Sequence, residues 1–490
     1  MRERVILVID QGTSATKGFL FDAHLNQIHT ERIPHRIFRP RPGWAESNPE
    51  DITSACHTLL NSLLEACLSR DLTPAALGMA FQRSTFLFWT KDKAEPLTPA
   101  LSWQDTRASS VVARLKQYAQ SVHKITGVPL SAHFGGPKFA YCVREDPELK
   151  SRVTSGEAFF GPLSAFVTHA LTGRALVDQS IAGRSLLIGL EEQEWNRTLL
   201  DLFDVPPQCL PPPVPTCHPF GPVKTPSGNL TLTCVLGDQQ ASLVGLKGID
   251  EGDVALNLGT SGSVLVNSGE TPRVVPSVLA SILYSFEDQS RFLLEGSING
   301  VGSLFRWLES FLGIPYREMR WEKRCKRPTR GILIPGINGM AAPYWTDEFE
   351  TALIDLSPGD NPDGVVRAAM ESIGFLVADI FQVLGEQGGV SLTEMVASGG
   401  FSRPVLLQFI ADLMGRSVWS SRRRDMTALG VARLVARQTW GTPLKGGAGV
   451  RAREFMPAMP PERRMEKIGR WRESLDNLGI HRYTVENTGG

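Results

Sequence analysis

Residues 5–21 of the chain are VILVIDQGTSATKGFLF, an apolar run, a short polar turn and a second apolar run. This pattern predicts two β-strands joined by a tight turn at Gly12. Residues 253–267, DVALNLGTSGSVLVN, repeat the arrangement near the middle of the chain. A single turn of this kind is usually an ordinary hairpin. Two copies in corresponding places predict a duplicated pair of α/β domains, each presenting the same hairpin.

Both turns carry groups suited to holding phosphate. Glycine lets the backbone approach an anion closely, and neighbouring N–H groups and hydroxyls can then donate to phosphate oxygens. The candidate phosphate ligands are Thr13, Ser14 and Lys17 in the first hairpin and Thr260 in the second. We therefore expect the two domains to grip one polyphosphate from both sides.

Phosphoryl transfer also requires a divalent metal and a base for the attacking hydroxyl. Asp10, at the tip of the first hairpin, is placed to hold Mg²⁺, which favours few carboxylates and several waters. Asp238 follows the predicted strand 231–236 and is a candidate general base. A Gly-Asp pair at a strand end is equally often a turn stabiliser, so the residue alone leaves both roles open.

Other polar residues lie at predicted strand ends. Arg83 could fork two substrate hydroxyls and Trp103 could pack on a carbon backbone, although a surface arginine and a buried tryptophan are the alternative. Gly399 and Gly400 follow a strand and precede a helix, which suits an adenine or ribose platform, although an ordinary strand–helix turn is the more frequent structure for such a pair in isolation. The six basic residues within 320–330 are interpreted as a solvated face.

Composition excludes several functional classes. A content of 42% hydrophobic and 21% charged residues predicts globular domains, and fifty-one basic residues balance fifty-one acidic ones, which argues against nucleic acid as a partner. The seven cysteines include no Cys-x-x-Cys pair, so we expect free thiols in a reducing cytoplasm. The N-terminal apolar run is too short for a signal segment, and no membrane span is expected.

The predicted elements alternate in type along most of the chain. A helix is expected over 50–69, capped near Asn48, with strands over 77–81 and 86–90 and a mainly helical stretch over 108–202. The proline-rich stretch 205–226 is expected to wrap over the first domain, because the strand 230–236 still belongs there. In the second half we expect strands at 254–258, 262–267, 291–295, 331–335 and 394–398 and helices at 299–312, 362–386, 403–415 and 427–438. The expected domains are 1–244 and 245–445, with a tail at 446–490.

Taken together, these motifs resemble the FGGY carbohydrate kinases, and most closely the glycerol branch of that family. The matching pieces occur in family order across roughly residues 4–440. They include Asp10-Gln-Gly-Thr-Ser, Pro42-Gly-Trp-Ala-Glu, Gln82-Arg83, Trp103-Gln-Asp, Gly237-Asp-Gln-Gln, Gly259-Thr260, Ala342-Pro-Tyr-Trp and Gly399-Gly400. The resemblance implies two actin-like, ribonuclease-H-like domains that close on ATP, Mg²⁺ and a small polyol or sugar in the cleft between them.

The resemblance also implies roles for individual residues. Asp238 would be the catalytic base and Asp10 the metal ligand. Nucleotide contacts would fall on Thr13, Ser14, Lys17, Thr260, Gly302, Arg306, Gly399 and Gly400. The substrate would be surrounded by Arg83, Ser84, Trp103, His133, Asp238, Gln239 and Ser263. A homodimer is a further expectation, and neither nucleic acid nor a membrane is expected as a partner.

The chain departs from the glycerol branch at three positions. Ser84 stands where that branch has a glutamate, His133 where it has a tyrosine, and Ser263 where it has an aromatic wall of the substrate pocket. These changes would enlarge the pocket, so a pentulose such as xylulose is an alternative substrate. A catalytically silent, actin-like nucleotide-binding regulator is the alternative from another functional class.

Overall fold

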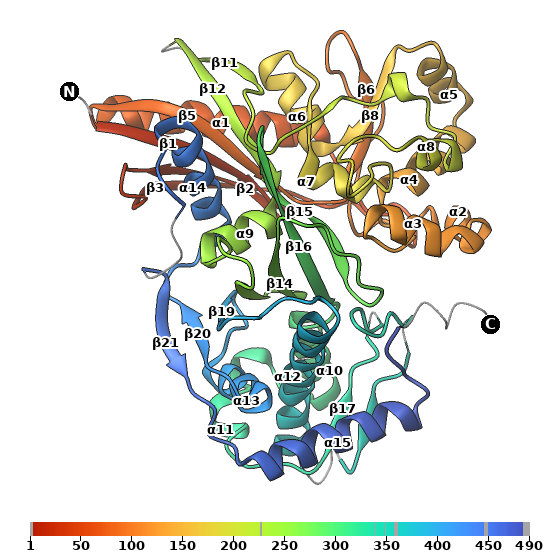
Figure 1. The fold of residues 1–490 in the computed structure, drawn as a ribbon, viewed down its shortest axis with the longest axis vertical. Helices are drawn as coiled ribbons and strands as arrows, with labels where there is room; N and C mark the ends of the chain where they lie inside the picture. The colour runs from red at the N-terminus through yellow and green to blue at the C-terminus, as the bar shows by residue number, and fades with distance from the viewer. Residues whose placement is uncertain are drawn as a thin grey trace.

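The molecule consists of two α/β domains, which lie above and below the centre of Figure 1. This computed structural model describes residues 3–225, 228–337, 339–347, 349–356, 361–444 and 449–483. Both duplicated hairpins are confirmed. Strand β1 (Glu3–Gln11) pairs antiparallel with β2 (Ala15–Phe21), and β13 (Val254–Leu258) pairs antiparallel with β14 (Gly262–Gly269).

A six-stranded sheet in the order β11-β12-β5-β1-β2-β3 forms the centre of the first domain. Its neighbours β1–β5 and β5–β12 run parallel, and the outer pairs are antiparallel. The ends of β1, β5 and β12 therefore lie at one edge of the sheet. The bounds of the remaining strands are β3 (Gln27–Pro34), β5 (Leu72–Phe81), β11 (Gly221–Thr225) and β12 (Gly228–Gly237).

Helix α1 (Pro49–Ser69) covers this sheet, close to the predicted bounds. The Asn48 side chain accepts a hydrogen bond from the Glu50 N–H, so it satisfies one of the free donors of the first turn. The buried face of the helix includes all five apolar residues that the 3.6-residue period selects, Ile52, Leu59, Leu60, Leu63 and Leu64.

The stretch 108–202 is less helical than its sequence predicts. Within it, β8 (Ala158–Pro162) pairs with β6 (Phe86–Thr90) in a second sheet of order β4-β7-β6-β8, where β4 is Glu46–Ser47 and β7 is Ala100–Leu101. Phe88 and Phe160 pack with ring centroids 4.7 Å apart across this pairing. The helices here are α2 (Ser109–Arg114), α3 (Ala119–Thr126), α4 (Gly135–Glu145), α5 (Pro147–Thr154), α6 (Leu163–Thr172), α7 (Gln179–Ala182) and α8 (Arg197–Leu202).

The proline-rich stretch stays with the first domain, as predicted. Strand β10 (Pro213–Val214) pairs with β9 (Val177–Asp178), and β11 continues into the edge of the main sheet beside β12. Pro226 of this stretch lies outside the described residues.

A seven-stranded sheet in the order β15-β16-β14-β13-β19-β20-β21 forms the centre of the second domain. Strand β15 was not predicted from the sequence; it lies at one edge of the sheet, beside β16. The strand bounds are β15 (Leu279–Phe286), β16 (Gln289–Ile298), β17 (Ile332–Ile334), β18 (Ala352–Ile354), β19 (Met395–Ser398), β20 (Val418–Ser421) and β21 (Arg451–Phe455). The helices are α10 (Gly302–Leu312), α11 (Trp321–Arg324), α12 (Pro362–Glu386), α13 (Pro404–Met414), α14 (Met426–Trp440) and α15 (Pro461–Asn477).

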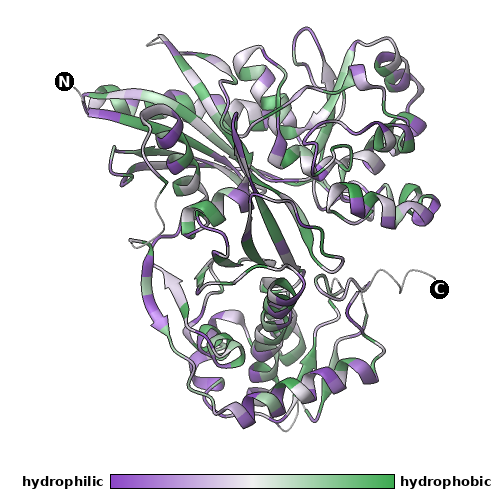
Figure 2. Ribbon diagram, in the orientation of Figure 1, coloured by the Kyte–Doolittle hydropathy of each residue, from purple (hydrophilic) through white to green (hydrophobic). Residues whose placement is uncertain are grey.

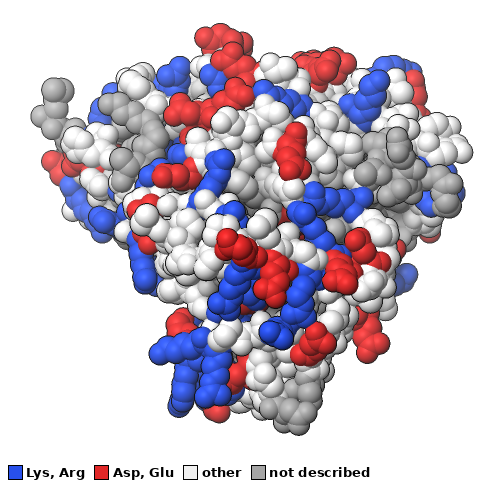
Figure 3. Space-filling view, turned by 60° about the horizontal axis from the view of Figure 1, so that its bottom comes forward, with Lys and Arg blue, Asp and Glu red and all other residues white. Residues whose placement is uncertain are grey.

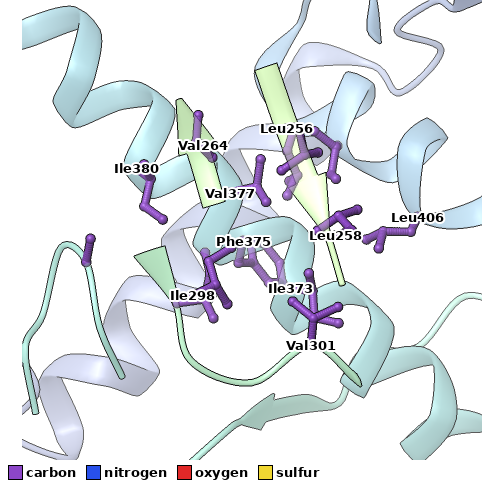
Figure 4. Packing of buried hydrophobic residues seen from close by; sticks show 14 of the residues in the cluster. Leu256, Leu258, Val264, Ile298, Val301, Ile373, Phe375, Val377, Ile380 and Leu406 are labelled. Carbon is purple, nitrogen blue, oxygen red and sulfur yellow. The ribbon is translucent and has the colours of Figure 1, made fainter. Parts of the chain in front are cut away.

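Helix α12 is the central helix of the second domain. Its residues Ile373, Val377 and Ile380 pack against Leu256 and Val264 of the sheet (Figure 4). Among the described residues it is the one helix long and apolar enough to cross a membrane by composition, yet most of it is buried within the domain. Figure 2 shows its apolar residues within the lower domain. Burial in the core accounts for its composition.

Two helices cross the expected boundary between the domains. Helix α9 (Asp238–Leu246) continues directly from β12 and contacts strands of the second sheet. Helix α14, which lies late in the sequence, packs instead against β1, β5 and β12 of the first sheet. A Cβ atom on Gly430 would lie 1.8 Å from the Ala241 carbonyl oxygen, so glycine is required where these two helices touch.

The segment expected to form a C-terminal tail adds two elements to the second domain. Strand β21 pairs with β20, and α15 packs beside α13 (Figure 1). The Trp471 indole N–H donates to buried Asp379 at 2.7 Å. Residues 446–448 and 484–490 of this segment lie outside the described residues.

The surface mixes charges of both signs. Figure 3, in which the second domain is turned toward the viewer, shows acidic side chains interspersed among the lysines and arginines. Within the basic run 320–330, Arg324 forms an ion pair with Asp363. This pairing agrees with a solvated face.

Candidate active site

The first hairpin places Asp10 and Thr13 where β1 meets β2. Asp10 is half-buried near the end of β1, opposite Lys17 in the register of the hairpin. The Lys17 ammonium lies 2.9 Å from the Asp425 carboxylate, which precedes α14. Thr13 accepts a hydrogen bond from the Trp103 indole N–H at 3.0 Å, and Ser14 is exposed. Asp425, which the sequence did not single out, therefore joins the second half of the chain to this hairpin.

The second hairpin gathers the glycine residues of the second domain. The Thr260 carbonyl accepts a hydrogen bond from the Gly302 N–H at 2.8 Å, while Thr260 itself is exposed. Gly399 has φ +100°, and a Cβ there would lie 2.3 Å from the Leu258 carbonyl oxygen. A Cβ on Gly400, in contrast, would meet no atom within 4 Å. The backbone at Gly400 is thus open to close approach by a ligand.

Arg306 lies on the exposed side of α10, one turn after Gly302. Contacts around the turn of the second hairpin therefore bring together four second-domain residues, Thr260, Gly302, Gly399 and Gly400. Arg306 belongs to the same helix as Gly302 and is exposed to solvent.

Asp238 and Gln239 begin α9 between the two hairpins. The Gln239 amide oxygen accepts from Ser263 Oγ at 3.1 Å and from Asn257 Nδ2 at 3.3 Å, on the strands that flank the second turn. Burial raises the pKa of Asp10 to about 7; Lys17 opposes this shift, while the nearby carboxylates of Asp238 and Asp425 add to it. Both hairpins therefore converge on the first residues of α9.

A buried ion cluster connects Asp238 to both domains. Arg83 directs its two terminal nitrogens to Glu295 of β16, at 2.6 and 2.8 Å, and its Nε lies 3.6 Å from Asp238. Arg184 donates to the same glutamate at 2.6 Å. The fork of Arg83, expected to hold two substrate hydroxyls, is thus occupied by a carboxylate of the second domain.

Glu295 and Arg184 were missed by the sequence reasoning. Glu295 interrupts an otherwise apolar strand, Phe292-Leu-Leu-Glu295-Gly-Ser-Ile. A carboxylate within a buried strand indicates a cationic partner, because an unpaired charge there is costly. The signal was present, but the identity of the partner depends on contacts distant in sequence.

Trp103, Ser84 and His133 lie together on the first-domain side. The His133 ring Nδ1 is 2.8 Å from the Trp103 carbonyl oxygen, and the Trp103 side chain is partly exposed. Ser84 is buried and has φ +61°, a left-handed conformation unusual for a residue with a side chain. Its carbonyl accepts from the Lys138 ammonium at 2.9 Å. Ser263 lies on the opposite, second-domain side, bonded to Gln239.

Electrostatics at Asp238 favour a proton acceptor of raised basicity. Burial raises the pKa of Asp238 above its ordinary value, and the Arg83 guanidinium opposes that shift. Arg83 and Arg184 lower the pKa of Glu295 to about 2 although burial alone would raise it, so Glu295 remains ionised. Of the two carboxylate side chains, that of Asp238 is the more exposed, at 28%.

The residues around Asp10 suit a magnesium ion held mainly by water and phosphate. No group of three metal-binding side chains occurs among the described residues. Asp10 nevertheless lies near two other carboxylates, those of Asp238 and Asp425; burial is the main cause of its raised pKa, and these two negative charges add to the shift. One or two carboxylates completed by phosphate oxygens are a donor set that Mg²⁺ commonly uses.

Comparisons with known proteins agree with this arrangement. The models for the N-terminal and C-terminal domains of the FGGY family of carbohydrate kinases match residues 5–245 and 254–439. A glycerol kinase of Rhizorhabdus wittichii is 31% identical over 485 residues, covering 95% of each chain.

Solved structures show the same fold. The crystal structure of Plasmodium falciparum glycerol kinase with ADP matches with a TM-score of 0.90 and 26% identity, covering 98% of this chain and 99% of the other. A ligand-bound xylulose kinase of Lactobacillus acidophilus matches with a TM-score of 0.86 and 21% identity over 97% and 98%. With family models matching most of its length and a site gathered between two related domains, the chain belongs to the FGGY family of carbohydrate kinases.

Proposed function

We propose that this kinase transfers the γ-phosphate of ATP to a terminal hydroxyl of a small polyol, either glycerol or a slightly larger one. The observation that carries the proposal is the position of Asp238. It begins α9 between the two glycine-rich hairpins, beside Arg83 and near Asp10. The similarity to glycerol kinases over nearly the whole chain supports the same reaction class.

In this mechanism Asp238 accepts the proton of the substrate hydroxyl as its oxygen attacks the γ-phosphorus. Burial raises the pKa of Asp238, which strengthens it as a base, and Arg83 keeps it oriented. Hairpin N–H groups and hydroxyls at Thr13, Ser14 and Thr260 would hold phosphate oxygens. Mg²⁺, held at Asp10, would neutralise phosphate charge.

The nucleotide would lie on the second domain. The open backbone at Gly400 and the neighbouring Gly302 and Gly399 would receive ribose or adenine, and Arg306 is exposed on the adjoining helix. Lys17 would reach phosphate only by leaving, or sharing, its ion pair with Asp425. Water would be excluded as the domains close on both substrates.

The polyol would lie between Trp103 and Gln239. Two small hydroxyl-bearing residues, Ser84 and Ser263, line opposite sides of this region, with His133 beside Trp103. Small side chains leave room beyond a three-carbon substrate, and their hydroxyls can pair with additional substrate hydroxyls. This polarity accommodates a polyol slightly larger than glycerol as well as glycerol itself, with a pentulose as the second candidate.

A coupled assay of ADP release would test the substrate. Purified protein with ATP and Mg²⁺ would be given glycerol, erythritol, xylulose and ribulose in turn. We expect turnover that depends on a polyol, with glycerol or erythritol giving the higher kcat/KM. A higher kcat/KM with xylulose would favour the pentulose alternative, and ATP hydrolysis unaffected by any polyol would contradict kinase function.

Three further expectations belong to this proposal: Mg²⁺ dependence, a cytoplasmic location and a homodimer. All seven cysteines are free, which is typical of a reducing compartment. Loss of turnover in a chelator, restored by added Mg²⁺, would support the metal. Light scattering on the purified protein would determine whether it is a dimer.

A further inference from the structure

Lys138 is a fully buried lysine beneath the substrate side of the first domain. Its side chain rises from α4, and the residue has no solvent exposure. Its ammonium donates hydrogen bonds to the carbonyl oxygens of Ser84 at 2.9 Å, Ser102 at 2.7 Å and Leu101 at 3.4 Å. All three donors of the ammonium therefore have backbone acceptors.

These carbonyls belong to two loops that carry substrate-binding residues. Ser84 follows Arg83 in the loop between β5 and β6, and Ser102 precedes Trp103 in the loop after β7. The strands next to these loops, β6 and β7, pair at Phe86 and Leu101. The Lys138 ammonium is thus a direct connection between the two loops.

The backbone at Ser84 shows why such a connection is needed. Its φ of +61° is a left-handed conformation that is unfavourable for a residue with a side chain. The Ser84 carbonyl points into the protein, towards Lys138. A hydrogen bond to a buried cation stabilises this conformation, and with it the direction in which Arg83 and Ser84 leave the chain.

Burying the charged side chain of Lys138 also costs free energy, which a purely structural role does not explain. Burial lowers its pKa to about 7, and the described residues form no ion pair with it. The Asp105 carboxylate favours the charged form of Lys138, but it is itself bonded to Arg107 and to the Ala45 N–H. An apolar side chain of similar length would avoid the desolvation of a charge.

We propose that Lys138 is a positioning residue that sets the separation between the Arg83–Ser84 loop and Trp103, and thereby the fit of the polyol. This inference rests on the proposed function, because it assumes that the two loops contact the acceptor substrate. It assigns Lys138 no contact with substrate and no role at the nucleotide.

The substitution Lys138→Met tests the proposal, because methionine fills similar volume without donors. We expect the KM for the polyol to rise about tenfold or more, since the two loops lose the hydrogen bonds that hold them at the separation the polyol requires. The KM for ATP should stay within about twofold, because Lys138 is proposed to act on the polyol side alone. A general disturbance of the fold would instead lower the affinities for both ATP and the polyol. Equal changes in both KM values, or a change in thermal stability alone, would overturn the proposal.

Lys247→Met is the matched control. Lys247 is another mostly buried lysine, in an ion pair with Asp253 at 3.0 Å and bonded to Thr393, away from the substrate loops. Its substitution should lower stability without changing the ratio of the two KM values.

Hydrogen exchange of the ligand-free protein tests positioning without any substrate. In Lys138→Met, backbone amides in residues 82–86 and 101–105 should exchange faster than in the wild type, while α1 stays protected. Unchanged exchange in these loops would overturn the proposal even if no polyol is a substrate. If the methionine variant does not fold, Lys138→Gln, which keeps amide donors, should show the same changes to a smaller degree.

Discussion

At the scale of single residues, Glu295 connects the second domain to the region of the proposed base, Asp238. Its carboxylate accepts from both Arg83 and Arg184, and all three side chains are largely buried. Removing one member of such a cluster leaves buried charge without a partner, which typically costs about 3–5 kcal/mol. Because Arg83 lies beside Asp238, the same loss would misplace a group next to the proposed base.

Glu295→Gln should therefore lower both stability and kcat. The folded-state pKa of Glu295 is about 2, below its ordinary value of 4.5, so its charge stabilises the fold above pH 4.5 and this contribution is lost as the pH falls toward 2. We expect the difference in unfolding free energy between wild type and variant to narrow below pH 4.5, measured by urea unfolding.

Glu287→Gln is the control for that experiment. Glu287 pairs with His218 near the turn between β15 and β16, but its side chain is 70% exposed. Its substitution should change neither kcat nor stability measurably. A loss comparable with that of Glu295→Gln would mean that the hairpin, rather than the buried cluster, is responsible.

The substitution Asp238→Asn tests whether Asp238 is the base of the reaction. Asparagine keeps the shape but cannot accept the proton, so we expect kcat to fall by about two to four orders of magnitude. Binding of ADP, measured by calorimetry, should be retained. In the wild type, kcat/KM should fall on the acid side at a pH above the ordinary Asp value, since burial raises the pKa of Asp238. Near-normal turnover in the variant would remove Asp238 as the base.

At the scale of elements, the contact between α9 and α14 determines where Asp238 lies. The helices touch through glycines: a Cβ on Gly245 would lie 1.9 Å from the Met426 carbonyl oxygen, and one on Gly430 would lie 1.8 Å from that of Ala241. Helix α14 in turn packs on β1, which carries Asp10. The close approach of these helices therefore holds Asp238 near the first hairpin.

Gly430→Ala should force α9 and α14 apart. Alanine in a helix interior is normally favoured over glycine by about 1 kcal/mol, but a clash here should reverse the sign and destabilise the protein by about 1–3 kcal/mol. Turnover should fall because Asp238 moves with α9. Thermal unfolding and kcat measure both effects.

Gly469→Ala provides the matched control, because Gly469 lies on exposed α15 and a Cβ there would meet no atom within 4 Å. This variant should be unchanged or slightly more stable. If Gly430→Ala behaved in the same way, the helices would have room to accept a side chain.

At the scale of the whole molecule, elements of each half are packed into the other. The β15–β16 hairpin of the second domain reaches α7 of the first, where Ser285 bonds to Gln179 and Thr216 (Figure 1). Lys17 and Asp425 form a further ion pair between the halves of the chain. The proposed substrates would both lie where these halves meet.

Binding of the two substrates should therefore be coupled. A ligand at about 100 times its Kd stabilises the folded state by about 2.7 kcal/mol, and two independent ligands add. We expect a non-hydrolysable ATP analogue and the preferred polyol together to raise the unfolding temperature by more than the sum of their separate effects. Strictly additive shifts would contradict closure of the domains on both substrates.

Features that follow from local patterns could be predicted from the sequence alone. The two glycine-rich hairpins, the Asn48 cap of α1 and the apolar face of that helix are each encoded within a few residues, because strand alternation, helical period and capping are local. The family motifs that carry Asp10 and Asp238 are equally short.

The contacts between residues distant in sequence, in contrast, became known from the three-dimensional fold. It placed α14 on the first sheet, paired Glu295 with Arg83 and Arg184, and set Lys138 under the carbonyls of Ser84 and Ser102. These contacts join residues far apart in the chain, where no local period or turn signal applies. These contacts form because unpaired buried charge and unfilled space between two packed domains both cost free energy.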